Sequence, residues 1–126
     1  SKLDIKSINI NNAKNDCLDF SFGNYKIQNA NLTNCGDKGF SVGEKSKLDL
    51  ENGFVTLSKI GVASKDEAIT NIEQIRMKEI DLCLSAYKKK KEFQGSKIKI
   101  NKFNCNNYKI KQESDSLSEI SILTEY

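Results

Sequence analysis

The sequence contains no histidine, no tryptophan and no proline. The absence of histidine removes the commonest general base and the commonest metal ligand of proteins. Catalytic triads of the Ser-His-Asp kind and histidine-based zinc sites are therefore excluded. We assign no catalytic residue, and we expect no cofactor and no metal ion.

A large excess of charge of one sign is also missing. Twenty basic residues nearly balance seventeen acidic ones, and the net charge is +3. Basic residues do not gather with aromatic residues on one face, as they do in proteins that bind nucleic acids. No apolar run approaches the roughly 18 residues that a membrane-spanning helix needs. We therefore expect no nucleic-acid partner and no membrane span.

A spacing of apolar or small residues repeats five times along the chain. In each set, the later members follow the first by three, five and eight residues, and successive sets start 22, 23, 22 and 28 residues apart. A self-similar period in this range is typical of a solenoid. The five sets are Ile5, Ile8, Ile10 and Ala13; Ile27, Ala30, Leu32 and Cys35; Leu50, Gly53, Val55 and Ser58; Ile72, Ile75, Met77 and Ile80; and Ile100, Phe103, Cys105 and Tyr108.

Alternation within the sets indicates strands, because residues two apart share one face of a strand. The steps of three turn the chain around corners. Left-handed β-helices repeat in hexapeptides, and a period of 22 does not fit that unit. The sequence therefore predicts an all-β, right-handed parallel β-helix of about five coils of about 22 residues, with three short strands per coil. The alternative is an antiparallel sandwich, which needs hairpin turns, and Asn52-Gly53 is the only Asn-Gly pair.

We interpret residues 1–126 as a single β-helix domain cut from a longer protein. Residues 88–95 lengthen the fourth coil and are expected to protrude as a loop. Residues 111–126 form either a cap or the start of a sixth coil. The first coil begins without a capping segment, and solenoids need polar caps. We therefore expect an adjacent domain or a partner to cover the N-terminal coil.

The four cysteines contain no C-x-x-C pair, so a zinc site is not favoured. Cys35 and Cys105 fall on core columns, where a free cysteine behaves as a small apolar residue. Cys17 and Cys83 fall in turns of coils that are not neighbours. We therefore expect free thiols, with one or more disulfides as the alternative. Free thiols argue mildly against an oxidising compartment.

The turn before each first strand is the most charged part of the repeat. In register, Glu44, Asp66 and Lys88 form one column, and Gly43, Lys65 and Tyr87 form another. Because neighbouring coils lie about 4.8 Å apart, such columns can bind a sugar or a cation. A solvated face with weak ion pairs is the alternative. The candidate ligand-binding residues are Glu44, Lys45, Lys65, Asp66, Tyr87 and Lys88.

Phe54 and Leu57 occupy columns that hold polar residues in other coils, so both are expected to point outward from the third coil. Together they are candidates for contact with a partner. The run from Lys88 to Lys91 is either a solvated loop or a site for an anionic polymer.

Three turn segments, residues 36–46, 60–66 and 85–89, resemble right-handed β-helix regions of the pectate-lyase superfold. They resemble in particular the β-helix regions found C-terminal to CotH-like kinase domains of bacterial proteins. The resemblance implies an accessory module, extracellular or at the cell surface, attached to another domain. Pectate lyases present acidic calcium ligands and a basic residue on the first strand. Here that face reads Asp4, Lys26, Asp49, Asn71 and Lys99, and the only arginine, Arg76, falls on the second strand.

The sequence thus predicts a non-catalytic module that binds a polysaccharide or a protein, or that spaces domains apart. One alternative is a polysaccharide lyase or hydrolase that uses Asp49, Lys26 or Lys99 for acid–base chemistry. Another is a rod that assembles end to end. The compartment stays open, since the resemblance favours the cell exterior and free thiols argue against it.

Overall fold

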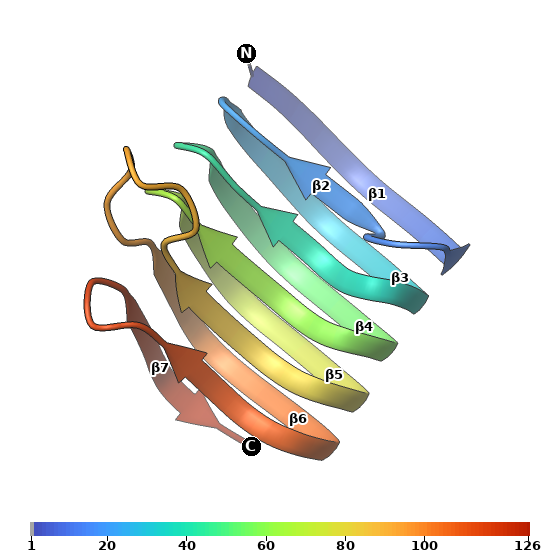
Figure 1. Ribbon diagram of the computed structural model, residues 1–126. Coiled ribbons are helices and arrows are strands. Elements are labelled where there is room, and N and C mark those ends of the chain that lie inside the picture. The colour runs from blue at the N-terminus through green and yellow to red at the C-terminus, as the bar shows by residue number, and fades with distance from the viewer. Residues whose placement is uncertain (1) are drawn as a thin grey trace.

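A computed structural model describes residues 2–126 as an all-β, right-handed parallel β-helix (Figure 1). Neighbouring strands pair in parallel in the order β1-β3-β4-β5-β6-β7, and β2 also pairs with β3. The strands are β1 (Lys2–Ala13), β2 (Leu18–Phe20), β3 (Asn24–Val42), β4 (Lys47–Lys65), β5 (Ile69–Tyr87), β6 (Lys97–Ser114) and β7 (Glu119–Glu125). Coil 1 contains β1 and β2, coils 2 to 5 begin with β3 to β6, and β7 opens a sixth coil.

The strand register confirms the period that the sequence predicts. Ile5 pairs with Ile27, and Ile27 pairs with Leu50. The same column continues through Ile72 and Ile100, and Ile122 of β7 extends it into the sixth coil. All five sets therefore occupy equivalent positions in successive coils.

The three expected strands of a coil are joined into one bent strand of 19 residues in β3, β4 and β5. We call its parts the first, second and third segments. The corner before the third segment is made by one residue with φ between 55° and 64° in each of five coils. A single left-handed residue turns the chain without ending the ladder, and asparagine tolerates this conformation best after glycine. The five corner residues are Asn12, Asn34, Leu57, Glu79 and Asn107.

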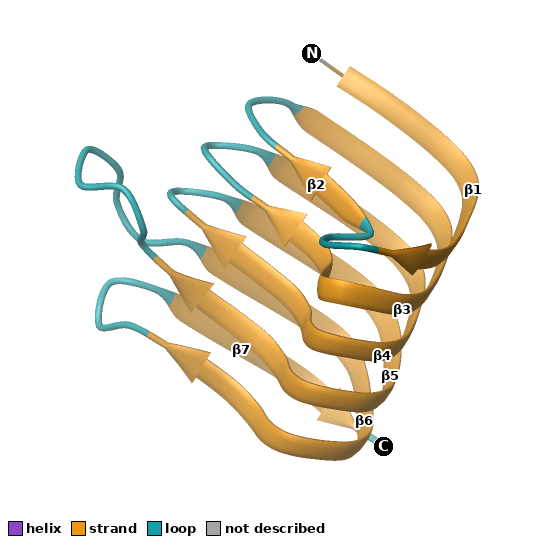
Figure 2. Ribbon diagram, turned by 45° about the vertical axis from the view of Figure 1, so that its right-hand side comes forward, coloured by secondary structure: helices purple, strands orange, loops and turns teal. Residues whose placement is uncertain are grey.

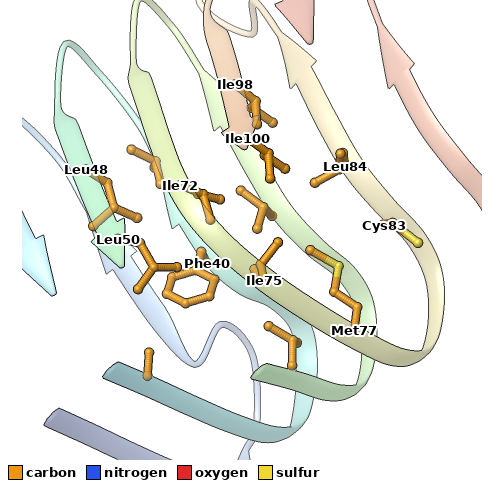
Figure 3. Close-up of a cluster of buried hydrophobic side chains, with 14 of the residues drawn as sticks. Phe40, Leu48, Leu50, Ile72, Ile75, Met77, Cys83, Leu84, Ile98 and Ile100 are labelled. Atoms are coloured by element: carbon orange, nitrogen blue, oxygen red, sulfur yellow. The ribbon is translucent and has the colours of Figure 1, made fainter. Parts of the chain in front are cut away.

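The core lies between the walls of the coil and is continuous along the rod (Figure 3). Side chains from neighbouring coils stack in columns, and bulky residues are accommodated by small ones. A Cβ atom on Gly53 would lie 2.9 Å from Leu50 Cδ2 and 3.1 Å from Ile75 Cγ1. Glycine at this core position therefore makes room for its neighbours. The core is only partly closed at coil 1, where Ile5, Ile8 and Ile10 are half-buried.

The expectation of free thiols was wrong, because all four cysteines form disulfides. Cys17 bonds to Cys35, and Cys83 bonds to Cys105. Each bond joins a cysteine of one coil to a cysteine of the next coil. Cys17 and Cys83, which lie in coils that are not neighbours, therefore do not have to bond to each other. Residues of coils 4 and 5 that pair in register lie 28 residues apart, as Leu82 and Ile110 do. The 22 residues between Cys83 and Cys105 are fewer than this, so the bond joins the third segment of coil 4 to the second segment of coil 5.

The loops that join one coil to the next lie along one edge of the rod, and the short loop between β1 and β2 lies away from that edge (Figure 2). The longest loop, residues 88–96, joins β5 to β6 and contains the expected insertion. β7 pairs in parallel with β6, so residues after 118 start a further coil. Within residues 2–126 there is no helix long and apolar enough to cross a membrane.

Candidate functional site

A shallow groove of about 870 Å³ runs along the outer face of the first segments, from coil 1 to coil 5. Strand alternation points two sets of polar side chains outward here, because the residue between them, such as Ile27 or Leu50, faces the core. The first set stacks in register. The first set is Asp4, Lys26, Asp49, Asn71 and Lys99, and the second is Lys6, Gln28, Glu51, Glu73 and Asn101.

Few polar groups of this groove are bonded to one another. Asn71 donates to Asp49 Oδ1 at 3.1 Å, and Asn101 donates to Glu73 Oε2 at 2.6 Å. The four ion pairs of residues 2–126 all lie outside the groove. Three ammonium groups and four carboxylates therefore line it without forming salt bridges, and they are free to meet a ligand.

The loops of coils 2 to 4 differ from the groove, because their carboxylates are bonded within the protein. We call residues 43–46, 65–68 and 88–96 the turn edge. Asp66 is fully buried, and its Oδ1 accepts hydrogen bonds from the backbone N–H groups of Lys89 at 2.7 Å and Lys90 at 2.9 Å. Glu67 accepts one from the N–H of Gln94 at 3.0 Å. The side chain of Lys90 pairs with Glu44 at 3.1 Å. Carboxylates of the turn edge therefore fasten the inserted loop to the rod.

Lys88, the first residue of the inserted loop, is also held by a carboxylate that accepts a backbone hydrogen bond. Its backbone N–H donates to Asp115 Oδ2 at 2.7 Å, and Leu117 N–H donates to the other oxygen at 3.2 Å. Burial alone would raise the pKa of Asp115, but the hydrogen bonds from Lys88, Leu117 and Ser118 outweigh it and lower that pKa. The ionised carboxylate of Asp115 is thus the form that holds the loop.

Tyr87 and Lys38 form a half-buried cluster on the third segments. Burial raises the pKa of the Tyr87 hydroxyl, and the charge of Lys38 opposes this only in part. Burial lowers the pKa of Lys38, but the hydrogen bond to Asp37 at 2.9 Å and the charge of Asp16 raise it above its ordinary value. Both groups are therefore held in their protonated forms by contacts within the protein.

The structure thus places the six candidate residues in different roles. It brings Glu44, Asp66 and Lys88 together at the base of the loop, where Asp66 is buried. Lys65 lies over Gly43, where an added Cβ atom would be 3.1 Å from Lys65 Cε. Lys45 is exposed. Ligand binding by this set stays a prediction.

A second, smaller depression of about 420 Å³ lies on the neighbouring second segments. Phe54 is half-buried there, with the guanidinium carbon of Arg76 5.3 Å from the centre of its ring. Leu57 is 46 % exposed at the corner of the same coil. Sequence reasoning missed the contact between Phe54 and Arg76. The signal is their spacing of 22 residues, which puts them in one column.

No group of three or more cysteine, aspartate and glutamate side chains within residues 2–126 is arranged to hold a metal ion. Comparisons with family models, with curated proteins and with solved structures find no match for this chain. Function is therefore inferred from the geometry of these surfaces.

Proposed function

We propose that this chain is a non-catalytic, extracytoplasmic β-helix module that binds a glycan along the groove of its first segments. One observation carries the proposal: charged and amide side chains line about 870 Å³ over five coils, and their charged groups form no ion pairs there. At the turn edge, by contrast, the carboxylates of Glu44, Asp66 and Glu67 are bonded to the inserted loop.

The composition of the groove favours an extended, uncharged, hydroxyl-rich ligand. Three lysines and four carboxylates give the lining a net charge of −1, so neither a polyanion nor a polycation is matched. A hydroxyl group both donates and accepts hydrogen bonds, and it can meet ammonium, carboxylate and amide groups in turn. Four steps between five coils, at about 4.8 Å each, give a groove about 19 Å long.

The disulfides support an oxidising compartment. Structural disulfides persist mainly in secreted and periplasmic proteins and at cell surfaces, and both pairs of cysteines are bonded here. This agrees with the accessory, cell-surface role that the resemblance to pectate-lyase-type β-helices implies. We include that role in the proposal.

A direct test is a binding assay on a panel of neutral and acidic polysaccharides. The groove variant combines Lys26→Gln, Asp49→Asn and Lys99→Gln, which keep side-chain size and remove charge. We expect it to lose about tenfold or more in affinity for the neutral glycan that the wild type binds, because hydrogen bonds to charged groups are removed.

The matched control combines Asp81→Asn, Lys109→Gln and Lys111→Gln, which make the same change of charge on exposed pairs elsewhere. It should bind like the wild type. The proposal fails if the groove variant binds as tightly as this control, or if no glycan binds the wild type.

The turn edge is the second position for a ligand, because Lys45 is exposed there beside the half-buried Lys65. A variant with Lys45→Gln and Lys65→Gln in the same assay distinguishes the two positions. Loss of binding in this variant, with the groove variant unchanged, would move the site to the turn edge.

A polysaccharide lyase or hydrolase is the second candidate function. The positions of Lys26 and Asp49 favour this function. The two residues pair in register within the groove, so two groups capable of acid–base chemistry lie side by side. Incubation with a panel of acidic polysaccharides, followed by the ultraviolet absorbance of unsaturated uronides, tests for lyase chemistry. Reducing-end release tests for hydrolysis.

A further inference from the structure

The depression on the second segments differs from the groove in its charge. Arg76 is the only charged residue among those that line it. The other polar groups are one hydroxyl and side-chain amides, and no carboxylate is present. The polar lining residues are Ser7, Asn9, Asn29, Asn31, Asn52, Gln74 and Arg76.

Arg76 is the single arginine of the chain. Its side chain is exposed, and within residues 2–126 its guanidinium group makes neither an ion pair nor a hydrogen bond. It does contact the ring of Phe54, at 5.3 Å from the guanidinium carbon. Such a contact holds the planar group over the ring and leaves its N–H edge available. A guanidinium edge matches a carboxylate through two parallel hydrogen bonds.

The amides beside Arg76 suit a ligand that itself contains amides. Side-chain amides both donate and accept, as the peptide backbone does. Asn52 donates to Asn29 Oδ1 at 3.5 Å, at the edge of hydrogen-bond range. Asn31 forms no hydrogen bond to another side chain within residues 2–126. These groups offer several bonds to an extended chain that crosses the second segments.

We infer that this depression binds an extended peptide segment of a partner protein, with one carboxylate of that segment on Arg76. The number of cationic side chains in the depression indicates whether its ligand is a peptide or an acidic polysaccharide. A polyuronate presents a carboxylate on every sugar and needs cations on successive coils. In the column of Arg76, however, the neighbours are Phe54 and Asn104. One cation between an aromatic ring and amides fits one acidic residue flanked by backbone amides.

The probe is a blocked pentapeptide, acetyl-Gly-Asn-Asp-Asn-Gly-amide, in which the aspartate carries the only carboxylate. It is titrated into the full ¹⁵N-labelled chain, and the Arg76 Nε–H signal is followed by NMR. This signal is unique, because the chain has one arginine. We expect saturable shifts of Arg76 and of the Phe54 amide. A peptide with asparagine in place of the aspartate should leave the Arg76 signal in place.

Three variants sharpen the test, and none of these residues lines the groove. Arg76→Gln should weaken binding about tenfold or more, because charge-assisted hydrogen bonds are lost. Arg76→Lys should keep only part of the affinity, since lysine has no planar fork. Lys78→Gln removes a nearby exposed charge on the same strand and should bind like the wild type.

The inference is overturned by the absence of shifts at millimolar peptide, by equal shifts with the asparagine peptide, or by unchanged binding in Arg76→Gln. Trigalacturonate is titrated in parallel. If it displaces the peptide and binds more tightly at Arg76, the ligand is an acidic glycan, and the peptide assignment is wrong. None of these outcomes depends on glycan binding in the groove.

Discussion

Two parts of the rod carry columns of charged side chains, the turn edge and the groove of the first segments. At the turn edge, Asp66 and Glu67 accept backbone hydrogen bonds from the inserted loop, and Glu44 pairs with Lys90. In the groove, Lys26 and Lys99 form no ion pair within residues 2–126. The same register thus gives two columns with different uses, one that holds a loop and one that faces solvent.

The difference shows that a column of charges is not by itself evidence of a binding site. What distinguishes the two regions is whether the carboxylates are bonded to a loop. Asp66 and Glu67 accept its backbone hydrogen bonds, whereas in the groove Asp49 and Glu73 accept only from neighbouring side-chain amides. An insertion of a few residues supplies backbone donors to the turn edge, and the first segments receive no such insertion. Four substitution experiments test this difference and the contacts around it, and we order them by the size of the effect we expect.

Removal of the Cys83–Cys105 disulfide, by replacing both residues with serine, should have the largest effect. This bond closes a loop of 22 residues that contains the inserted segment. Loop-closure entropy predicts a decrease of about 3 kcal/mol in the free energy of unfolding, measured by urea titration. Replacement of Cys17 and Cys35 should cost a similar amount at the other end of the rod. Unchanged unfolding midpoints under reducing conditions would contradict the disulfides themselves.

Asp66→Ala should lower the free energy of unfolding by about 2 kcal/mol, because two backbone N–H groups lose a charged acceptor. Asp66→Asn should cost less, since it keeps an acceptor and tolerates the φ of 53°. Asp49→Ala in the groove should change stability by less than about 0.5 kcal/mol, as an exposed or half-exposed substitution does. Equal losses of unfolding free energy for Asp66→Ala and Asp49→Ala in urea titrations would contradict the structural role that we assign to the turn edge alone.

Stability should fall in alkali because of the third-segment cluster. The pKa of Tyr87 and that of Lys38 are both raised from their ordinary values of 10.0 and 10.5. A group with a raised pKa contributes its full stabilisation below its unfolded pKa and loses it as the pH rises through the folded pKa. The urea midpoint should therefore decline above about pH 10, and less steeply in Tyr87→Phe. A decline of equal slope in that variant would exclude Tyr87 as a cause.

Leu57→Asn should have the smallest effect, a stabilisation of about 1 kcal/mol or less. Leu57 adopts a φ of 58°, which is unfavourable for a branched side chain and better tolerated by asparagine. Asn34→Leu at the same corner is the reverse change, and it also removes the hydrogen bond to Asn12 at 2.8 Å. Thermal unfolding should move in opposite directions for the two variants. A loss of stability in Leu57→Asn would contradict the corner assignment.

The fold was accessible from the sequence because each coil repeats one register. The column from Ile5 to Ile100 depends only on the spacing of apolar residues, and the structure confirms it. The corner asparagines follow from the same register, since Asn12, Asn34 and Asn107 adopt positive φ.

The contacts between coils could not be predicted from the sequence in the same way. Cys17 and Cys83 were assigned to turns of distant coils, while their partners lie one coil further along. The burial of Asp66 depends on where the inserted loop folds, and backbone N–H groups carry no sequence signal. The second set of groove residues, such as Glu51 and Glu73, was missed because outward positions show no apolar period.

NMR of the ¹⁵N-labelled chain during titration with the neutral glycan that binds best shows directly whether the groove or the turn edge is the binding surface. We predict shifts along the column of Lys26, Asp49, Asn71 and Lys99, while Lys89 and Lys90, whose N–H groups are held by Asp66, stay in place. Shifts confined to Lys89, Lys90 and the rest of the turn edge would contradict glycan binding in the groove.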